Sequence, residues 1–176
     1  RGEARAARAV YILGDLFESW IGDDDDSEIA QRVQAALHDL VQAGVAVAFL
    51  HGNRDFLVGA AFAARTGVHL LPDPAPITLA GEATLLMHGD TLCLGDTAYQ
   101  AVRRQLRDPA WQARFLAQPL AARRAFAARA RAESQAHTAA AASDIMDVTP
   151  AEVLRVMAAQ GATRLNEISL AARIGD

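Results

Sequence analysis

The sequence predicts an α/β fold in a single domain that spans residues 1–176. Three short apolar segments have the length and composition of buried strands, and each ends in a cluster of polar residues. Segments with helix start and stop signals follow the first two of these strands. A chain of 176 residues with 52% hydrophobic and 22% charged residues is long enough for one core, so we expect one compact domain.

The first strand is expected in residues 9–13, a continuous apolar run that ends at Gly14 and Asp15. A carboxylate is therefore placed on the loop that follows a buried strand. Ser27 can cap a helix that continues to about residue 43, because apolar residues recur along one of its faces, and Gly44 ends it.

The second strand is expected in residues 45–50, and a polar motif follows it at residues 51–55. A short helix is then predicted over residues 56–65, with Gly67 as its stop signal. This repeats the order of strand, polar loop and helix.

The third polar cluster follows a predicted hairpin. Residues 77–79 and 83–87 are strand-like, and residues 80–82 have the composition of a three-residue turn between them. The second strand of this hairpin ends at His88-Gly89-Asp90.

Residues 96–143 predict a helical insertion that could pack as a separate cap, since they contain no strand signals and are broken only at Pro109 and Pro119. Thr149 and Glu152 have the spacing of a capping box at the start of a further helix that ends near residue 160. The last 15 residues are weakly patterned.

Composition excludes several classes of protein. A net charge of −4 and a pI near 5.7 give no electrostatic reason to bind nucleic acid, whose phosphates select a strongly basic face. Cys93 is the only cysteine, which excludes a disulfide framework and fits a reducing cytoplasm. We expect neither a membrane span nor an export signal, because no apolar run approaches about 18 residues and no apolar segment follows the charged start.

The three polar clusters together predict a metal site. In α/β sheets, ligands bind at the carboxyl ends of the strands, which is where Asp15, Asn53 and His88 are expected. Their mixed oxygen and nitrogen donors suit manganese, iron or zinc better than calcium. A carboxylate can bridge two such ions, and an ion pair can activate water and neutralise a phosphoryl oxygen, which is the chemistry of phosphoester hydrolysis.

Each residue also has a structural role open to it when it is taken alone. A Gly-Asp pair after a strand commonly forms a turn, and His88 can be a hydrogen-bonded structural histidine. Asn53 can occupy a left-handed turn position, which asparagine tolerates. Only the order of all three clusters on three strand ends favours the metal site.

These motifs resemble those of the calcineurin-like metallophosphoesterases, which run Asp-x-His, Gly-Asp, Gly-Asn-His-Asp/Glu, His and Gly-His-x-His. The middle three motifs are present, with Arg54 in place of the usual histidine. Within this superfamily the chain is similar to the UDP-2,3-diacylglucosamine pyrophosphatases of lipid A biosynthesis. That similarity covers roughly residues 8–165 and is carried by segments 11–24, 51–59, 87–93, 131–134 and 144–148, together with Asp96 and the pair Tyr99-Gln100.

The resemblance implies an αββα sandwich with two manganese ions in an intact site, of which we expect this chain to bind one or none well. Asp15 would bridge the two ions, and Asn53 and His88 would be ligands of one of them. Asn53 and Arg54 would also approach the substrate's phosphates, because the planar fork of arginine suits bidentate contact with phosphate.

The resemblance further implies a UDP-linked diacylated glucosamine as substrate, with the 96–143 insertion holding its acyl chains. Asp96, Ser134 and Thr138 would contact the sugar nucleotide, although Thr138 stands where the family usually has asparagine. A cytoplasmic protein held peripherally at the bacterial inner membrane is also implied.

The first and last motifs of the superfamily have no counterpart in this sequence. We therefore expect a domain that is incomplete at both ends, with the family's fold and with little or no activity. Two alternatives remain open at this point. One is another metallophosphoesterase that acts on nucleotides or phosphodiesters, and the other is a truncated relic without catalytic activity.

Several other features allow both a functional and a structural interpretation. The acidic run 23–26 lacks the spacing of a calcium loop, so we interpret it as a solvated loop with helix-start charges. Trp20 is the better candidate of the two tryptophans for the rim of the site. The arginines of the helical insertion predict mostly solvated surface, and His38, His69 and His137 are expected to be structural or surface residues.

Overall fold

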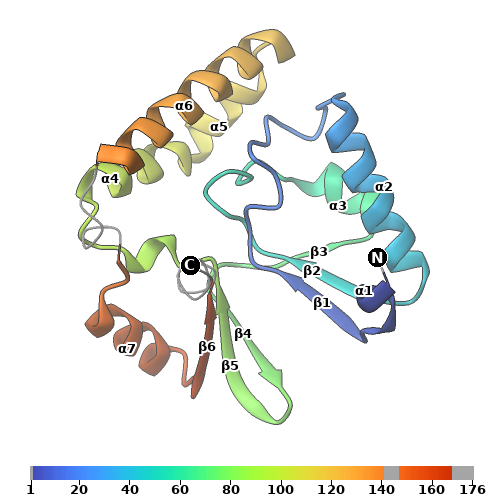
Figure 1. The fold of residues 1–176 in the computed structure, drawn as a ribbon, viewed down its shortest axis with the longest axis vertical. Helices are drawn as coiled ribbons and strands as arrows, with labels where there is room; N and C mark the ends of the chain where they lie inside the picture. Colours follow the sequence, from blue (N-terminus) through green and yellow to red (C-terminus); the bar gives the residue numbers. More distant parts are fainter. Residues whose placement is uncertain (1, 141–146, 168–176) are drawn as a thin grey trace. The chain divides into compact units, whose positions relative to one another are not determined.

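The computed structural model describes residues 2–140 and 147–167, without the side chains of residues 2, 3 and 137–140. The chain forms two compact units, Arg1–Pro72 and Asp73–Asp176, and each contains its own small sheet (Figure 1). The predicted mixture of helices and strands is confirmed. That the two units belong to one domain stays a prediction.

The sheet of the first unit is parallel. Strands β1 (Ala9–Ile12), β2 (Ala46–Phe49) and β3 (His69–Leu70) lie in that order, with β2 in the centre. Val10 lies opposite Val47, and Phe49 lies opposite Leu70. Strands β1 and β2 confirm the predicted segments, whereas β3 and the short helix α1 (Gly2–Ala6) were not predicted.

Helix α2 (Glu28–Gln42) has the predicted start and stop. The Ser27 hydroxyl accepts a hydrogen bond from the Ala30 amide, and Gly44 has a φ of +88° in the turn after the helix. Helix α3 (Ala60–Thr66) ends as predicted at Gly67, which has a φ of +75°. Its predicted start at residue 56 is wrong by four residues, because Val58 forms a turn whose amide donates to the Asp55 carbonyl.

Aromatic side chains fill the core of the first unit. Trp20 is 2% exposed, and its ring lies 4.4 Å from that of Phe17 and 5.3 Å from that of Phe62. The interpretation of Trp20 as a rim residue of the site is therefore wrong. This tryptophan belongs to the core, where aromatic pairs stabilise the packing beyond the area they bury.

The sheet of the second unit contains a hairpin and a parallel strand. Strands β4 (Ala75–Leu79) and β5 (Glu82–Met87) are antiparallel, and β6 (Arg164–Glu167) pairs in parallel with β5. Leu79 lies opposite Glu82, so the turn has two residues, Ala80 and Gly81, with φ of +51° and +85°. The predicted three-residue turn is therefore wrong by one residue.

Helices fill most of the second unit between β5 and β6. The 3₁₀ turn η1 (Asp90–Leu92) leads to helices α4, α5, α6 and α7, which span Thr97–Leu106, Pro109–Leu116, Leu120–Ala140 and Pro150–Ala159. The helices predicted in this segment are present as far as residue 140, and residues 141–146 lie outside the described part; that the segment packs as a separate cap stays a prediction. No helix in the described ranges is both long and apolar enough to cross a membrane.

The predicted capping box of α7 is wrong. The Thr149 side chain makes no capping hydrogen bond, and the carboxylate of Glu152 instead accepts two hydrogen bonds from Arg155, at 2.6 and 2.8 Å. Helix α7 is held by packing, since Val153 and Val156 contact the buried residues Leu85, Met87 and Leu92. The start of the helix was predicted correctly from Pro150, whose fixed φ suits the first turn.

Candidate functional site

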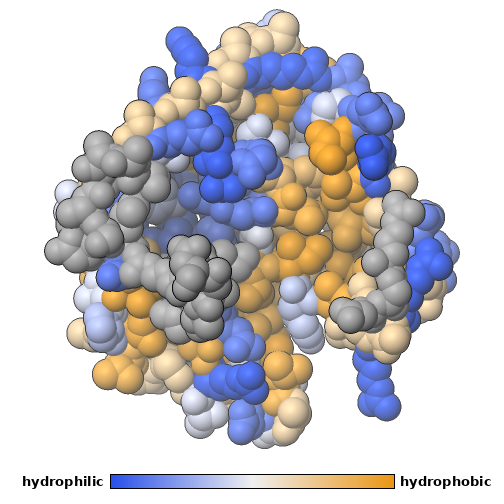
Figure 2. Space-filling view, viewed as in Figure 1, coloured by the Kyte–Doolittle hydropathy of each residue, from blue (hydrophilic) through white to orange (hydrophobic). Residues whose placement is uncertain are grey.

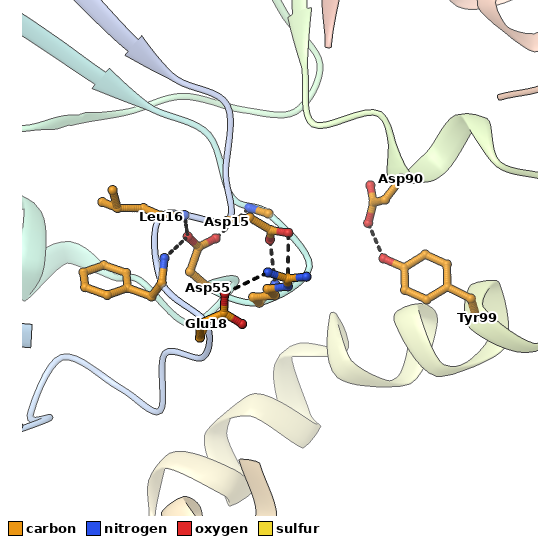
Figure 3. Close-up of polar contacts among 9 residues, drawn as sticks. Asp15, Leu16, Glu18, Asp55, Asp90 and Tyr99 are labelled. Atoms are coloured by element: carbon orange, nitrogen blue, oxygen red, sulfur yellow. Dashed lines mark hydrogen bonds and ion pairs between the residues drawn. The ribbon is translucent and has the colours of Figure 1, made fainter. Parts of the chain in front are cut away.

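The carboxyl ends of β1 and β2 bring two of the predicted polar motifs together. The Leu50 amide donates to the Ile12 carbonyl at 2.8 Å, so the loops that leave the two strands begin side by side. Gly14 and Asp15 both have positive φ, +91° and +53°, which turns the first loop sharply (Figure 3). A non-glycine residue in this conformation is uncommon, and aspartate is among those that tolerate it.

Asn53 and Arg54 both contact the Asp15 carboxylate. The Arg54 backbone amide donates to Asp15 Oδ1 at 3.1 Å, and the Arg54 Nε lies 3.4 Å from Asp15 Oδ2 in an ion pair. With its nitrogen facing Asp15, the Asn53 amide donates to both carboxylate oxygens at 2.8 Å. The second loop thus contacts both oxygens of this carboxylate.

The donor set around Asp15 fits a divalent cation. Asp15 supplies two carboxylate oxygens and the adjacent Asn53 side chain can supply an amide oxygen, and these are donor types that divalent cations take in proteins. The loops have no room for a larger residue at position 52, since a Cβ on Gly52 would lie 2.3 Å from the Asp15 backbone nitrogen and from its Oδ1.

The Asp55 carboxylate accepts hydrogen bonds from both loops. Its side chain is fully buried; Oδ2 accepts from the amides of Leu16 at 2.7 Å and Phe17 at 3.4 Å, and Oδ1 accepts from the Gly52 amide at 2.8 Å (Figure 3). Burial raises the pKa of Asp55, the Gly52 amide lowers it, and the nearby Asp15 charge raises it again; the net direction is upward. Sequence reasoning included Asp55 in the motif but gave it no role.

Glu18 is a second residue that sequence reasoning missed. Its Oε1 lies 3.3 Å from Arg54 Nη1, so the guanidinium is held between Glu18 and Asp15. The Arg54 side chain is 33% exposed and the Glu18 side chain 75% exposed. An incoming anion can therefore compete with Glu18 for the guanidinium.

His88 follows β5 in the second unit, as predicted, and is 4% exposed. Two residues later, Asp90 Oδ2 accepts from the Tyr99 hydroxyl at 2.6 Å (Figure 3). The same oxygen accepts from Arg103 Nε at 2.7 Å. Burial works to raise the pKa of Asp90, but the Arg103 charge and the Tyr99 hydrogen bond outweigh it and lower that pKa. Burial and the Asp90 charge raise the pKa of Tyr99, so its phenol keeps the proton that it donates.

Asp73 is a further carboxylate near His88. Both of its carboxylate oxygens are buried and accept no hydrogen bond of good geometry within the described residues. Burial raises the pKa of Asp73, and the Asp90 charge adds to this effect, while His88 and Arg103 act in the opposite direction.

The residues predicted to contact the sugar nucleotide lie in the helical insertion. Asp96 is 7% exposed and is the N-cap of α4, where its Oδ1 accepts from the Tyr99 amide at 2.9 Å. Ser134 lies on the exposed surface of α6. The side chain of Thr138 lies outside the described residues.

The structure brings Asp15 and Asn53 together, with Arg54 beside them. His88 belongs to the other unit, and its approach to Asp15 stays a prediction. Among the described residues, no three side chains of histidine, cysteine, aspartate or glutamate gather as a metal site by themselves.

The acidic run 23–26 acts as a structural element. Asp23 accepts hydrogen bonds from the amides of Gly59 and Phe62, both at 2.9 Å, and so caps α3 from a distant loop. Asp25 accepts from the Ser27 amide at 3.1 Å, just before α2. The interpretation as helix-start charges is confirmed for Asp25, whereas the capping of α3 by Asp23 was not predicted.

Two of the three histidines without a partner motif are structural or surface residues, as predicted. His38 is exposed and its Nδ1 lies 3.1 Å from the Arg65 carbonyl oxygen, and His69 is an exposed residue of β3. The side chain of His137 lies outside the described residues.

Comparison with known proteins finds relatives that are more than half identical to this chain and that share one name. A UDP-2,3-diacylglucosamine hydrolase of Xanthomonas oryzae pv. oryzae (strain PXO99A) is 55% identical over 172 residues, which cover 94% of this chain and 70% of the relative. The hydrolase of the same name from Xanthomonas campestris pv. campestris (strain B100) is 54% identical with the same coverage. That of Cellvibrio japonicus (strain Ueda107) is 53% identical over 161 residues, 92% of this chain and 67% of the relative. No family model matches the chain.

Proposed function

The chain belongs to the UDP-2,3-diacylglucosamine hydrolase family, and from this membership we propose that it cleaves the pyrophosphate bond of UDP-2,3-diacylglucosamine. The products would be UMP and 2,3-diacylglucosamine 1-phosphate, which places the reaction in lipid A biosynthesis. The observation that carries this proposal is the approach of Asn53 and Arg54 to the Asp15 carboxylate on two neighbouring loops.

Asp15 and Asn53 would hold a divalent cation, for which we propose manganese, and His88 would complete the ligands that this chain supplies. A bound divalent ion polarises a phosphoryl oxygen and lowers the pKa of water. Asp15 contributes negative charge on both oxygens, and Asn53 contributes a neutral oxygen once its amide is turned toward the ion. The close approach of the loops at Gly52 limits how far these two side chains can separate.

Arg54 would bind the diphosphate of the substrate. Its guanidinium presents planar, parallel N–H donors that match two phosphate oxygens, and it is partly exposed beside the cation-binding pair. Glu18 holds the same guanidinium from the solvent side when no anion is present. Exchange of Glu18 for phosphate keeps the arginine charge paired throughout binding.

The lipid part of the substrate would bind to the helical insertion, and the protein would associate peripherally with the cytoplasmic face of the bacterial inner membrane. Arg114 on α5 and Arg124 and Arg129 on α6 are exposed. Figure 2 shows hydrophilic residues in blue alternating with pale apolar residues in the region of these helices. Exposed arginines favour association with anionic lipid, at about 1 kcal/mol per residue near the surface.

The proposed reaction is tested by release of UMP from UDP-2,3-diacylglucosamine. Of the ligands that the resemblance implies, these 176 residues contain Asp15, Asn53 and His88, so we expect the chain alone to be slow or inactive. A version extended with strands that carry the Asp-x-His and Gly-His-x-His motifs should release UMP with manganese and should stop when a chelator is added. In this version, Arg54→Lys should lower kcat/KM by about tenfold or more, because lysine keeps the charge but lacks the fork.

Three results would contradict the proposal. The first is an extended chain that binds manganese and releases no UMP, and the second is UMP release that persists in chelator. The third is faster hydrolysis of a simple phosphodiester than of the UDP-linked lipid, which would favour another metallophosphoesterase activity.

A further inference from the structure

We propose that Asp55 is a positioning residue, whose buried carboxylate fixes Asp15 against Asn53 and Arg54. This inference rests on the proposed function, because that function gives Asp15 and Asn53 their roles. Asp55 itself touches neither substrate nor cation. It acts through the backbone of the two loops that carry Asp15 and Asn53.

The three amides bonded to Asp55 flank the cation-binding pair in sequence. Leu16 and Phe17 immediately follow Asp15, and Gly52 immediately precedes Asn53. The partners on the first loop lie 38 and 39 residues from Asp55 along the chain, so the carboxylate links two distant segments. One oxygen binds the first loop and the other binds the second, which makes the relative position of the loops depend on this side chain.

A carboxylate is the side chain that this position requires. All three partners are backbone N–H groups, which can only donate, so both side-chain atoms at the end of residue 55 must be hydrogen-bond acceptors. Asparagine has nearly the same shape but would turn an NH₂ group toward one of these N–H donors. One loop would then lose its hydrogen bond to residue 55, and because this side chain is fully buried, the unpaired N–H group would lower the stability of the fold.

Asp23 provides a matched control within the same unit. Its carboxylate also accepts two backbone amides, those of Gly59 and Phe62, together with the Trp20 indole nitrogen at 3.2 Å. The two amide bonds fix the start of α3, the indole bond stays within the 20–23 loop, and none of the three involves the turn at residues 14–17. Replacement of either aspartate should lower stability, but only the replacement of Asp55 should disturb Asp15.

The test compares Asp55→Asn and Asp23→Asn in the full 176-residue chain by two measurements. The first is the backbone amide resonance of Arg54 in ¹H–¹⁵N spectra without metal, since that amide donates to Asp15 Oδ1. The second is manganese binding, measured by electron paramagnetic resonance. We expect Asp55→Asn to shift the Arg54 amide proton upfield and to weaken manganese binding by about 10–100-fold, as loss of an outer-shell partner commonly does. Asp23→Asn should leave the resonance in place and the affinity within about twofold of the wild type.

The proposal is overturned if Asp55→Asn leaves the Arg54 resonance unmoved, or if Asp23→Asn disturbs it equally. If the wild-type chain binds no manganese, the proposed cation site fails, and the Arg54 resonance alone decides the role of Asp55. If Asp55→Asn does not fold, the role of Asp55 is tested by measuring amide hydrogen exchange in the wild-type chain. The amides of Leu16, Phe17 and Gly52 should then open together at one rate, and independent, faster exchange of Leu16 and Phe17 would refute the link.

Discussion

At the scale of single residues, the site depends on how closely Gly52 approaches Asp15. A Cβ at position 52 would lie 2.3 Å from the Asp15 backbone nitrogen, and a backbone atom cannot move aside as a flexible side chain can. Gly52→Ala should therefore lower the free energy of unfolding by about 2–3 kcal/mol and weaken cation binding at Asp15. Urea denaturation and manganese titration measure the two effects.

Gly44→Ala is the matched control for this substitution. Gly44 has a φ of +88° and no atom within 4 Å of a built Cβ, so its replacement costs only the left-handed conformation, about 1–2 kcal/mol. It should leave manganese binding unchanged. Equal loss of binding in both variants would show that general destabilisation, and not the approach to Asp15, is responsible.

Sequence patterns identified the residues of the site that carry recognisable chemistry, and missed those that support them. Asp15, Asn53 and Arg54 were found because each follows a buried strand in a familiar order of motifs. The roles of Asp55 and Glu18 were not found. Asp55 accepts hydrogen bonds from backbone amides and Glu18 forms an exposed ion pair with Arg54, and neither role produces a periodic pattern in the sequence. Trp20 was assigned to the rim because its acidic neighbours suggested exposure, whereas its ring packs on Phe17 and Phe62.

At the scale of elements, Asp90 attaches helix α4 to the end of β5. The side chains of Tyr99 and Arg103 donate to its carboxylate, and the Gln100 side chain donates to its backbone carbonyl at 2.7 Å. Arg103→Gln should lower the free energy of unfolding by about 2–3 kcal/mol, because it removes the cation that pairs with a buried carboxylate. Denaturation by urea, followed by circular dichroism, measures this change.

Arg104 is the control for this variant, since it is the exposed neighbour of Arg103 on the same helix. Arg104→Gln should change the unfolding free energy by less than about 0.5 kcal/mol. If the two variants have equal effects, Asp90 is not what attaches α4.

The β4–β5 hairpin makes a separate prediction. Both turn residues have positive φ, a geometry that favours asparagine followed by glycine, but the first position is Ala80. Ala80→Asn should therefore raise the unfolding free energy by roughly 0.5–1 kcal/mol, and Gly81→Ala should lower it. Thermal unfolding of the two variants compares them directly, and a loss of stability in Ala80→Asn would contradict the two-residue turn.

Sequence reasoning located the elements better than their ends. Strands β1, β2 and β5 were found because a continuous apolar run that ends in polar residues is typical of a buried strand. The start of α3 was misplaced because its cap comes from Asp23, 36 residues before Gly59, which no local pattern reveals. Strands β3 and β6 were missed because they are short, and their pairing to β2 and β5 depends on tertiary contacts.

At the scale of the whole molecule, the chain contains two units with separate sheets. The first holds Asp15, Asn53 and Arg54, and the second holds His88 and the helical insertion. The α/β class was predictable from alternating strands and helices. The αββα sandwich and the approach of His88 to Asp15 stay predictions, because they concern how the two units pack.

We propose that Asp15 and Asn53 together bind a divalent cation, and manganese titration followed by electron paramagnetic resonance is the first measurement to make. Asp26→Asn is the matched control, since Asp26 is an exposed carboxylate of the acidic run in the same unit. We predict that the wild-type chain and Asp26→Asn bind manganese alike and that Asp15→Asn binds it at least about 100-fold more weakly. Equal binding by Asp15→Asn and the wild type, or a loss of binding in Asp26→Asn instead, would show that manganese does not bind at Asp15.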